Sequence, residues 1–189
     1  TLWDRLEISR PGAGEDERIR MHKLALTTVL TSQGVAFLHA GSELLRTKQG
    51  VENSFESPDA INRIDWSRKG SYADVYDYVH ALIRLRKQHP AFRMTNTEQI
   101  RKHLEFLEVD DDLLVAYTLD DHANGDDWER ILVILNGNRT DRPFDLPPGQ
   151  WSVVLDDEAL DENGRGEREG TVTVPASSAL VLVHSTQGE

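Results

Sequence analysis

The side chains best suited to binding chemistry lie between residues 42 and 70. Glu43, Asp59 and Asn62 place carboxylate and amide groups in this stretch, and Arg46 is a nearby cation. Asp59 can accept hydrogen bonds and Asn62 can both accept and donate them, so either side chain could contact a polar ligand. The alternative is that both residues cap turns around Pro58. The residue types leave these two interpretations open.

Histidines and acidic turns are the groups that could bind a metal ion. The seven histidines are scattered and form no His-x-x-x-His pattern, so a zinc site is not expected. The chain has no cysteine, which excludes disulfides and thiolate ligands. The oxygen-rich turns at 110–112 and 120–127 leave calcium open, but their spacing does not match an EF-hand. We therefore expect no metal and no cofactor, with solvated turns favoured over a calcium site.

Aromatic residues are the third group with a possible binding role. Phe55 and Trp66 could stack on a bound ligand, but their spacing among isoleucines favours anchoring in a core. Trp3 suits either packing or a ligand cleft. Trp128 and Trp151 fall in the second half of the chain, where burial is the default interpretation.

The first half of the chain alternates helix, strand and helix. Acidic residues at 15–17 open a helix that ends near Gly34. The apolar run 35–39 then predicts a strand buried on both faces. A long polar connection follows, and an apolar stripe predicts a second helix over 72–88, which Pro90 ends.

The second half has the period-2 pattern of a β structure. Its short strands are separated by turn residues, which is typical of a β-sandwich. The predicted strands are 103–109, 113–119, 130–135, 151–155, 171–174 and 179–184.

Charge is distributed unevenly between the two halves. The 189 residues carry a net charge of −12, and residues 98–189 hold 7 Lys and Arg against 21 Asp and Glu. An acidic surface repels phosphate groups, so neither a nucleic acid nor an anionic membrane is an expected partner. No apolar run approaches the roughly 20 residues that a membrane span needs.

Several blocks of sequence resemble the type I pullulanases of the alpha-amylase superfamily. The matching blocks occur in the family order and correspond to the segment after the seventh barrel strand, the eighth strand with its extension, the following loop and the last barrel helix: 1–4, 30–48, 53–66 and 82–93. Ala36 departs from the family, which often has Pro at that position.

The resemblance implies an α+β chain of two parts. Residues 1–97 would be the C-terminal fragment of a (β/α)8 barrel, with one strand and two long helices, and residues 98–189 an all-β sandwich domain. A complete barrel needs eight strands and typically about 250 residues. We therefore expect strand 35–39, without its barrel neighbours, to be ill-ordered or paired with another chain. We also expect helix 72–88 to pack on the β domain.

The resemblance also implies a function for the parent enzyme. It would hydrolyse α-1,6-glucosidic links in pullulan, glycogen or limit dextrin with retention, and its catalytic carboxylates would all precede Thr1. No catalytic residue is therefore assigned here, and the chain alone is predicted to be inactive. Asp59 and Asn62 are the candidate substrate-binding residues, while Glu43 and Arg46 would be structural residues near the cleft.

Two other functions stay open from the sequence. The chain could be a non-catalytic glycan-binding or scaffold module, or come from a relative with another linkage specificity. The expected partners are an α-glucan, bound through the parent enzyme, and the rest of the catalytic barrel. The sequence does not decide between a cytoplasmic and a secreted bacterial enzyme.

Overall fold

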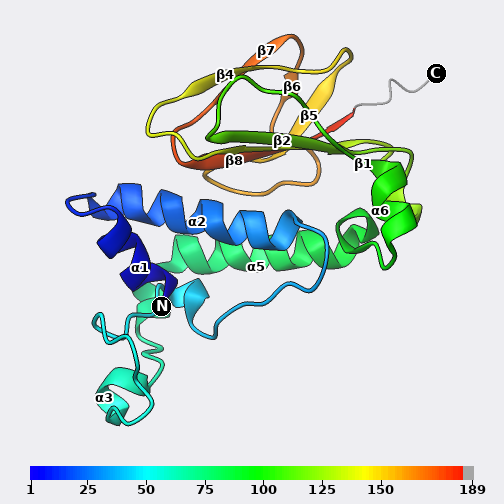
Figure 1. The fold of residues 1–189 in the computed structure, drawn as a ribbon. Coiled ribbons are helices and arrows are strands. Elements are labelled where there is room, and N and C mark those ends of the chain that lie inside the picture. Colours follow the sequence, from blue (N-terminus) through cyan, green and yellow to red (C-terminus); the bar gives the residue numbers. More distant parts are fainter. Residues whose placement is uncertain (185–189) are drawn as a thin grey trace.

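The computed structural model describes residues 1–184, which form a layer of helices and two antiparallel sheets. Figure 1 shows the two long helices side by side, with the sheets on one side of them and the α3 region on the other. No helix in the described part of the chain combines the length and hydrophobicity needed to cross a membrane.

The two long helices are α2 (Glu15–Thr31) and α5 (Ala73–Gln88), which pack against each other. Three acidic residues in the first turn of α2 favour its start, because they complement the helix dipole. Its end is fixed by Arg86 of α5, whose guanidinium donates to the carbonyls of Leu30, Ser32 and Gly34. Both predicted long helices are confirmed, although α2 ends at Thr31, slightly before the end expected near Gly34.

The remaining helices are short. They are α1 (Leu2–Ser9), η1 (Ser42–Leu44), α3 (Asp59–Asn62), α4 (Arg68–Ser71), η2 (Pro90–Arg93), α6 (Thr97–His103) and η3 (Ala123–Gly125). Sequence patterns did not indicate α1 or α6, because neither carries a long apolar stripe.

The larger sheet has six strands in the order β1-β2-β3-β8-β5-β6, and β4 pairs with β7 in a separate sheet. The strands are β1 (Leu104–Phe106), β2 (Leu114–Leu119), β3 (Ile131–Asn136), β4 (Arg142–Asp145), β5 (Trp151–Leu155), β6 (Glu167–Arg168), β7 (Thr171–Val174) and β8 (Ser178–His184). Every pairing among them is antiparallel. Most predicted strands are confirmed, but the 103–109 strand shrinks to β1, and β4 and β6 were missed.

The central strands β3 and β8 are apolar throughout because both of their faces are covered. Ile131 and Val133 belong to a core shared with the helices, whereas Leu132 and Ile134 belong to a second core shared with the small sheet. Since side chains alternate along a strand, the continuous apolar run follows directly from this placement. The core shared with the helices contains residues from both sides of residue 97.

The predicted strand at 35–39 does not form in the described chain. Val35 and Phe37 are 98% and 82% exposed, while Ala36 and Leu38 pack against the helix core. The in-and-out alternation is that of a strand, but no other segment of residues 1–184 pairs with it. A strand needs neighbours for its backbone hydrogen bonds, so an apolar run alone does not make one.

The expected packing of helix 72–88 on the β half needs adjustment. The helix closest to the sheet is α2, which contacts β3 and β8, and α5 packs along α2. Buried residues of α5 nevertheless join the same core as the sheet, and Arg84 pairs with Glu162 at 3.6 Å. Both long helices therefore contribute to the same core, with α2 contacting β3 and β8 and α5 packing along α2.

Candidate functional site

The candidate site is the rim segment, residues 46–66, together with η1 just before it. Figure 1 shows that the α3 part of this segment lies beyond the helices, away from both sheets. Apart from the four residues of α3, the rim segment contains no helix or strand. Its position therefore depends on side-chain hydrogen bonds rather than on a sheet.

Arg46 holds the start of the rim segment by bonding to backbone carbonyls. Its Nη1 donates to Ala40 at 3.1 Å, and its Nη2 donates to the carbonyl of Asn62. The side chain crosses Gly41, where a Cβ would lie 2.7 Å from Arg46 Cδ and where φ is 91°. Only glycine fits this position without strain. Arg46 thus joins the backbone at Ala40 to the backbone at Asn62, and its Nε has no partner among residues 1–184.

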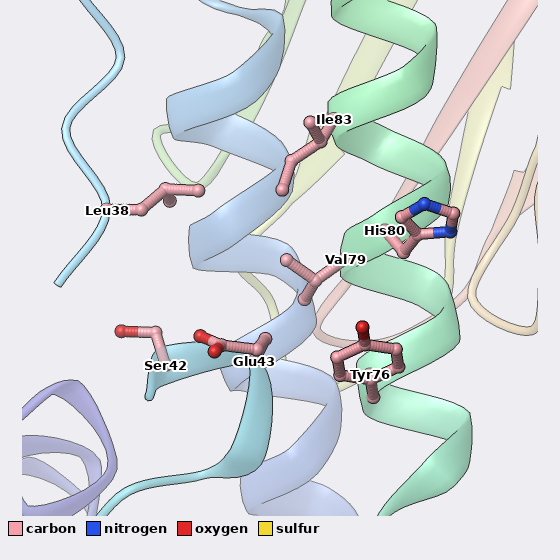
Figure 2. A pocket seen from close by; sticks show the side chains of 7 residues that line it. All are labelled: Leu38, Ser42, Glu43, Tyr76, Val79, His80 and Ile83. Carbon is pink, nitrogen blue, oxygen red and sulfur yellow. The ribbon is translucent and has the colours of Figure 1, made fainter. Parts of the chain in front are cut away.

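Glu43 lies at the edge of a cavity rather than against Arg46. Its Oε2 accepts a hydrogen bond from the backbone N–H of Gly41 at 3.1 Å. No ion pair joins Glu43 to Arg46 among the contacts of the described residues, because the Arg46 guanidinium donates to backbone carbonyls. The cavity has a volume of about 200 Å³ and is lined by Leu38, Ser42, Glu43, Tyr76, Val79, His80 and Ile83 (Figure 2).

The two candidate substrate-binding residues, Asp59 and Asn62, have different surroundings. Asn62 is half-buried, and its amide donates to the carbonyls of Ser54 and Ser57 at 2.8 and 2.9 Å. Both of its donors therefore hold the rim segment together. Asp59 is exposed at the first position of α3, and its carboxylate has no partner in the described chain. Of the two, Asp59 has the side chain that remains open to a ligand.

The aromatic residues of this region are exposed, which corrects the prediction that they anchor a core. Phe55 is 85% exposed and Trp66 is 64% exposed. The spacing among isoleucines suggested burial, but the rim segment has no second layer in the described chain to bury them. By contrast Trp3 and Trp151 are buried, and Trp128 stacks on His89 with ring centroids 3.4 Å apart.

Some of the acidic side chains considered for calcium are bound by other protein groups. Asp111 accepts hydrogen bonds from Arg142 and Asn138, and Asp126 accepts from His89. Across residues 1–184, no group of three or more His, Cys, Asp or Glu side chains is arranged to hold a metal ion.

Comparisons with known proteins place this geometry in a family. A family model described as "Pullulanase, all-beta domain" matches residues 100–159. The pullulanase of Bacillus subtilis strain 168 is 36% identical over 182 residues, which cover 96% of this chain and 25% of that protein. The chain belongs to the pullulanase family.

Solved structures of the pullulanase family superpose on nearly the whole chain. The structure of the pullulanase from Bacillus acidopullulyticus has a TM-score of 0.93 at 45% identity, and the match covers 97% of this chain and 23% of that one. The pullulanase from Paenibacillus barengoltzii, in complex with maltohexaose and α-cyclodextrin, has a TM-score of 0.86 at 42% identity, covering 98% and 28%. The chain thus spans about a quarter of the length of the pullulanases it matches.

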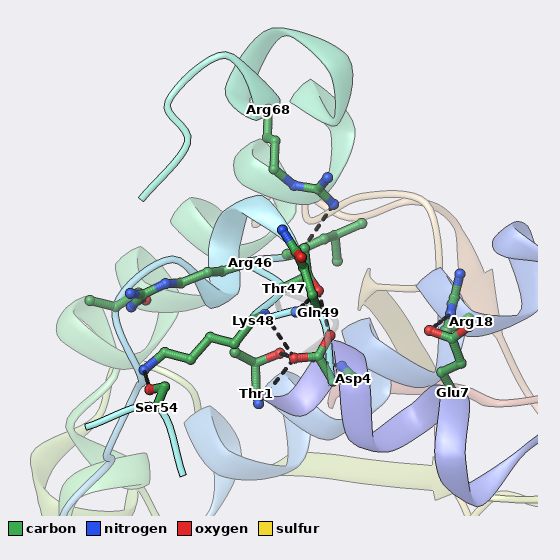
Figure 3. Close-up of polar contacts among 12 residues, drawn as sticks. Thr1, Asp4, Glu7, Arg18, Arg46, Thr47, Lys48, Gln49, Ser54 and Arg68 are labelled. Carbon is green, nitrogen blue, oxygen red and sulfur yellow. Dashed lines mark hydrogen bonds and ion pairs between the residues drawn. The ribbon is translucent and has the colours of Figure 1, made fainter. Parts of the chain in front are cut away.

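Sequence reasoning missed one feature of this pullulanase-family chain, the buried carboxylate of Asp4. Burial raises the pKa of Asp4, but hydrogen bonds from Thr47, the N–H of Lys48 and Thr1 outweigh it and leave the pKa below its usual value. Figure 3 shows these groups converging on Asp4. The one available signal was the spacing of Thr1 and Asp4, which form a capping box at the start of α1.

Proposed function

We propose that this chain is the C-terminal segment of a debranching glycoside hydrolase that cleaves α-1,6-glucosidic links in pullulan, glycogen or limit dextrin with retention. The observation that carries the proposal is the match of nearly the whole chain to about a quarter of several pullulanases. One of those relatives is described in complex with maltohexaose, an α-glucan. The α-glucan is accordingly the proposed ligand of the parent enzyme.

The proposed place of residues 1–97 is the end of the catalytic barrel, with residues 98–189 as the C-terminal β-sandwich domain. The exposed side chains of Val35 and Phe37 support this, since they alternate with inward side chains as in a strand whose neighbours are elsewhere. In the longer enzyme, segment 35–39 would be the eighth barrel strand. The rest of the barrel is then the proposed partner that covers this apolar surface.

The proposed catalytic carboxylates lie outside this chain. Retaining hydrolysis requires two carboxyl groups about 5–5.5 Å apart on either side of the scissile bond. Among the seven residues that line the cavity beside the rim segment, Glu43 is the one carboxylate. Its bond to the Gly41 N–H supports a structural role rather than a catalytic one.

The rim segment is proposed to form part of the wall of the glycan cleft. Asp59 supplies a free carboxylate that can accept hydrogen bonds from sugar hydroxyls, and Phe55 and Trp66 offer exposed rings that can stack on a pyranose face. Asn62 was a candidate ligand of equal standing, but its donors already bind the rim backbone. We assign its amide nitrogen to holding the rim segment, with its side-chain oxygen, Oδ1, left for the sugar.

An assay of pullulan hydrolysis by the isolated chain tests the proposal that the catalytic carboxylates lie outside it. The chain is incubated with pullulan, and reducing ends are measured beside a sample of Bacillus subtilis pullulanase as the positive control. The proposal predicts no release above the buffer blank. Robust turnover by the isolated chain would place a complete active site within it and would refute the proposal.

The alternative function is a glycan-binding or scaffold module that works without the barrel. The exposure of Phe55 and Trp66 in the chain as it stands is the observation that favours it. Calorimetric titration with maltotetraose separates the two functions. Millimolar or tighter binding that Trp66→Ala abolishes would support a module, and no binding would support a segment that depends on the rest of the enzyme.

A further inference from the structure

Asp4 is a buried acid that contacts the rim segment from a distant part of the sequence. It lies in the first turn of α1 and is 7% exposed. Its Oδ1 accepts from the hydroxyl of Thr47 at 2.5 Å, and its Oδ2 accepts from the N–H of Lys48 at 2.9 Å and the hydroxyl of Thr1 at 2.8 Å. The contacts with Thr47 and Lys48 join residues more than 40 positions apart along the chain.

The bonds that begin at Asp4 continue through the rim segment. The ammonium group of Lys48 donates to the hydroxyl of Ser54 at 2.6 Å, and Asn62 donates to the carbonyl of the same Ser54 at 2.8 Å. The hydroxyl of Thr47, which donates to Asp4, accepts in turn from the N–H of Gln49 at 2.8 Å. Asp4 is therefore connected through Lys48 and Ser54 to Asn62 at the end of α3. Figure 3 shows the part of this series from Asp4 to Ser54.

The buried carboxylate is the fixed end of this series of bonds. Helix α1 packs on α2, and Trp3, next to Asp4, belongs to the core shared with the sheet. The rim segment has no sheet of its own, so its order must come from bonds to a rigid body. Hydrogen bonds to a buried charged group are among the stronger ones, and a lost partner leaves that charge unsatisfied.

We propose that Asp4 is a positioning residue that fixes the rim segment and thereby sets where Asp59 stands. Its carboxylate does not touch the glycan and acts through Thr47 and Lys48. The meaning of this placement for glycan binding rests on the proposed function. The effect on the order of the rim segment does not, since it concerns this chain alone.

Hydrogen exchange measured by mass spectrometry tests the first step. Asp4→Asn removes one of the two acceptor oxygens, and we expect exchange in peptides covering 47–57 to become about tenfold faster. The matched control is Glu7→Gln, which also removes a charge from α1 but at a residue that pairs with Arg18 and not with the rim. Peptides covering β3 should be unchanged in both variants and report that the fold is intact.

A second pair of variants keeps the test decisive if Asp4→Asn fails to fold. Thr47→Val removes the partner hydroxyl from the rim side, whereas Thr47→Ser retains it. We expect faster exchange in 47–57 with valine and near-normal exchange with serine. Unchanged exchange in both Asp4→Asn and Thr47→Val would overturn the proposal and leave the proposed function untouched.

The second step is tested in the longer enzyme that the proposed function requires. There, Asp4→Asn should raise the KM for pullulan several-fold with a smaller effect on kcat, and Glu7→Gln should change neither. A loosened rim segment with an unchanged KM would overturn the positioning role in glycan binding. It would also count against the proposed place of the rim in the cleft.

Discussion

The β half and the rim segment of this chain are held in place by different interactions. Strands β3 and β8 are covered on both faces, by helices on one side and by the β4–β7 sheet on the other. The rim segment carries exposed aromatic rings and is held by side-chain bonds to backbone carbonyls. The β half buries its apolar faces within the chain, whereas the rim segment exposes aromatic side chains that a folded protein normally covers.

This contrast shows where the chain is self-sufficient. The stabilisation from burying apolar side chains scales with the area removed from water. Most of the buried apolar side chains of residues 1–184 belong to the β half, so we expect that half to supply most of the stability. The rim segment buries few apolar side chains, and the exposed carboxylate of Asp59 stays in contact with water. The predictions below challenge that difference, beginning with the largest expected effect.

A pair of tryptophan truncations compares the two regions directly. Trp151 is fully buried between the sheets and donates to the carbonyl of Pro147, so Trp151→Ala should lower the free energy of unfolding by about 3–5 kcal/mol. Trp66 is 64% exposed, and Trp66→Ala should change it by less than about 1 kcal/mol. Urea denaturation measures both. Equal losses would contradict the contrast between the regions.

The buried His22 makes stability depend on pH where the helix layer meets the rim. Its Nε2 lies 2.8 Å from the carbonyl of Ser42, its Nδ1 has no partner among residues 1–184, and burial lowers its pKa to about 4. Because the unfolded chain binds the proton near pH 6.5, unfolding takes up a proton between the two values. Stability should therefore fall by about 2 kcal/mol from pH 7 to pH 5.

Variants separate this effect from that of other groups. His22→Leu should flatten the pH dependence of the free energy of unfolding between pH 7 and pH 5, whatever it does to stability at pH 7. His80→Gln, which changes an exposed histidine on α5, should leave that dependence as it is. An identical pH profile for the wild-type chain and His22→Leu would exclude His22 as its source.

The amide of Asn62 should matter locally rather than globally. Asn62→Ala removes two hydrogen bonds to the rim backbone, each with a net value of about 1 kcal/mol. We expect faster hydrogen exchange around residues 54–57 and a nearly unchanged urea midpoint, since no side chain of the rim segment belongs to either hydrophobic core. A large shift of the midpoint would show that the rim is part of the cooperative core.

Asp59 gives the smallest expected effect on stability. Asp59→Asn should leave the free energy of unfolding within about 0.5 kcal/mol, because the carboxylate is exposed and has no partner among the described residues. In the longer enzyme, the same change should raise the KM for pullulan. Loss of stability without any change in KM would reverse the assignments of Asp59 and Asn62.

Features that depend on neighbouring residues could be predicted from the sequence, whereas features that depend on contacts between distant segments could not. Helices α2 and α5 and strands β2, β3 and β8 follow from local periodicity, which is why their patterns indicated them. The short β4 and β6 are defined by their partners rather than by their residues. Residues 35–39 have the composition of a strand, but composition cannot supply the neighbours that a strand requires.

The candidate site also combines features that local sequence indicates with features that only the fold determines. The residue types of Asp59 and Asn62 indicated hydrogen-bonding roles, but only the fold shows that Asn62 is occupied and Asp59 is free. The bond between Asp4 and Thr47 spans 43 residues, and nothing in either local sequence indicates the other. The exposure of Phe55 and Trp66 likewise depends on which surfaces lie nearby.

The proposed place of this chain in a longer debranching enzyme is tested most directly by a graft. The matching quarter of Bacillus subtilis pullulanase is replaced by this chain, and pullulan hydrolysis is measured beside the truncated enzyme and the isolated chain. We predict that the graft releases reducing ends and that neither part does so alone. Hydrolysis by the isolated chain, or a soluble and folded graft without hydrolysis, would contradict the proposal.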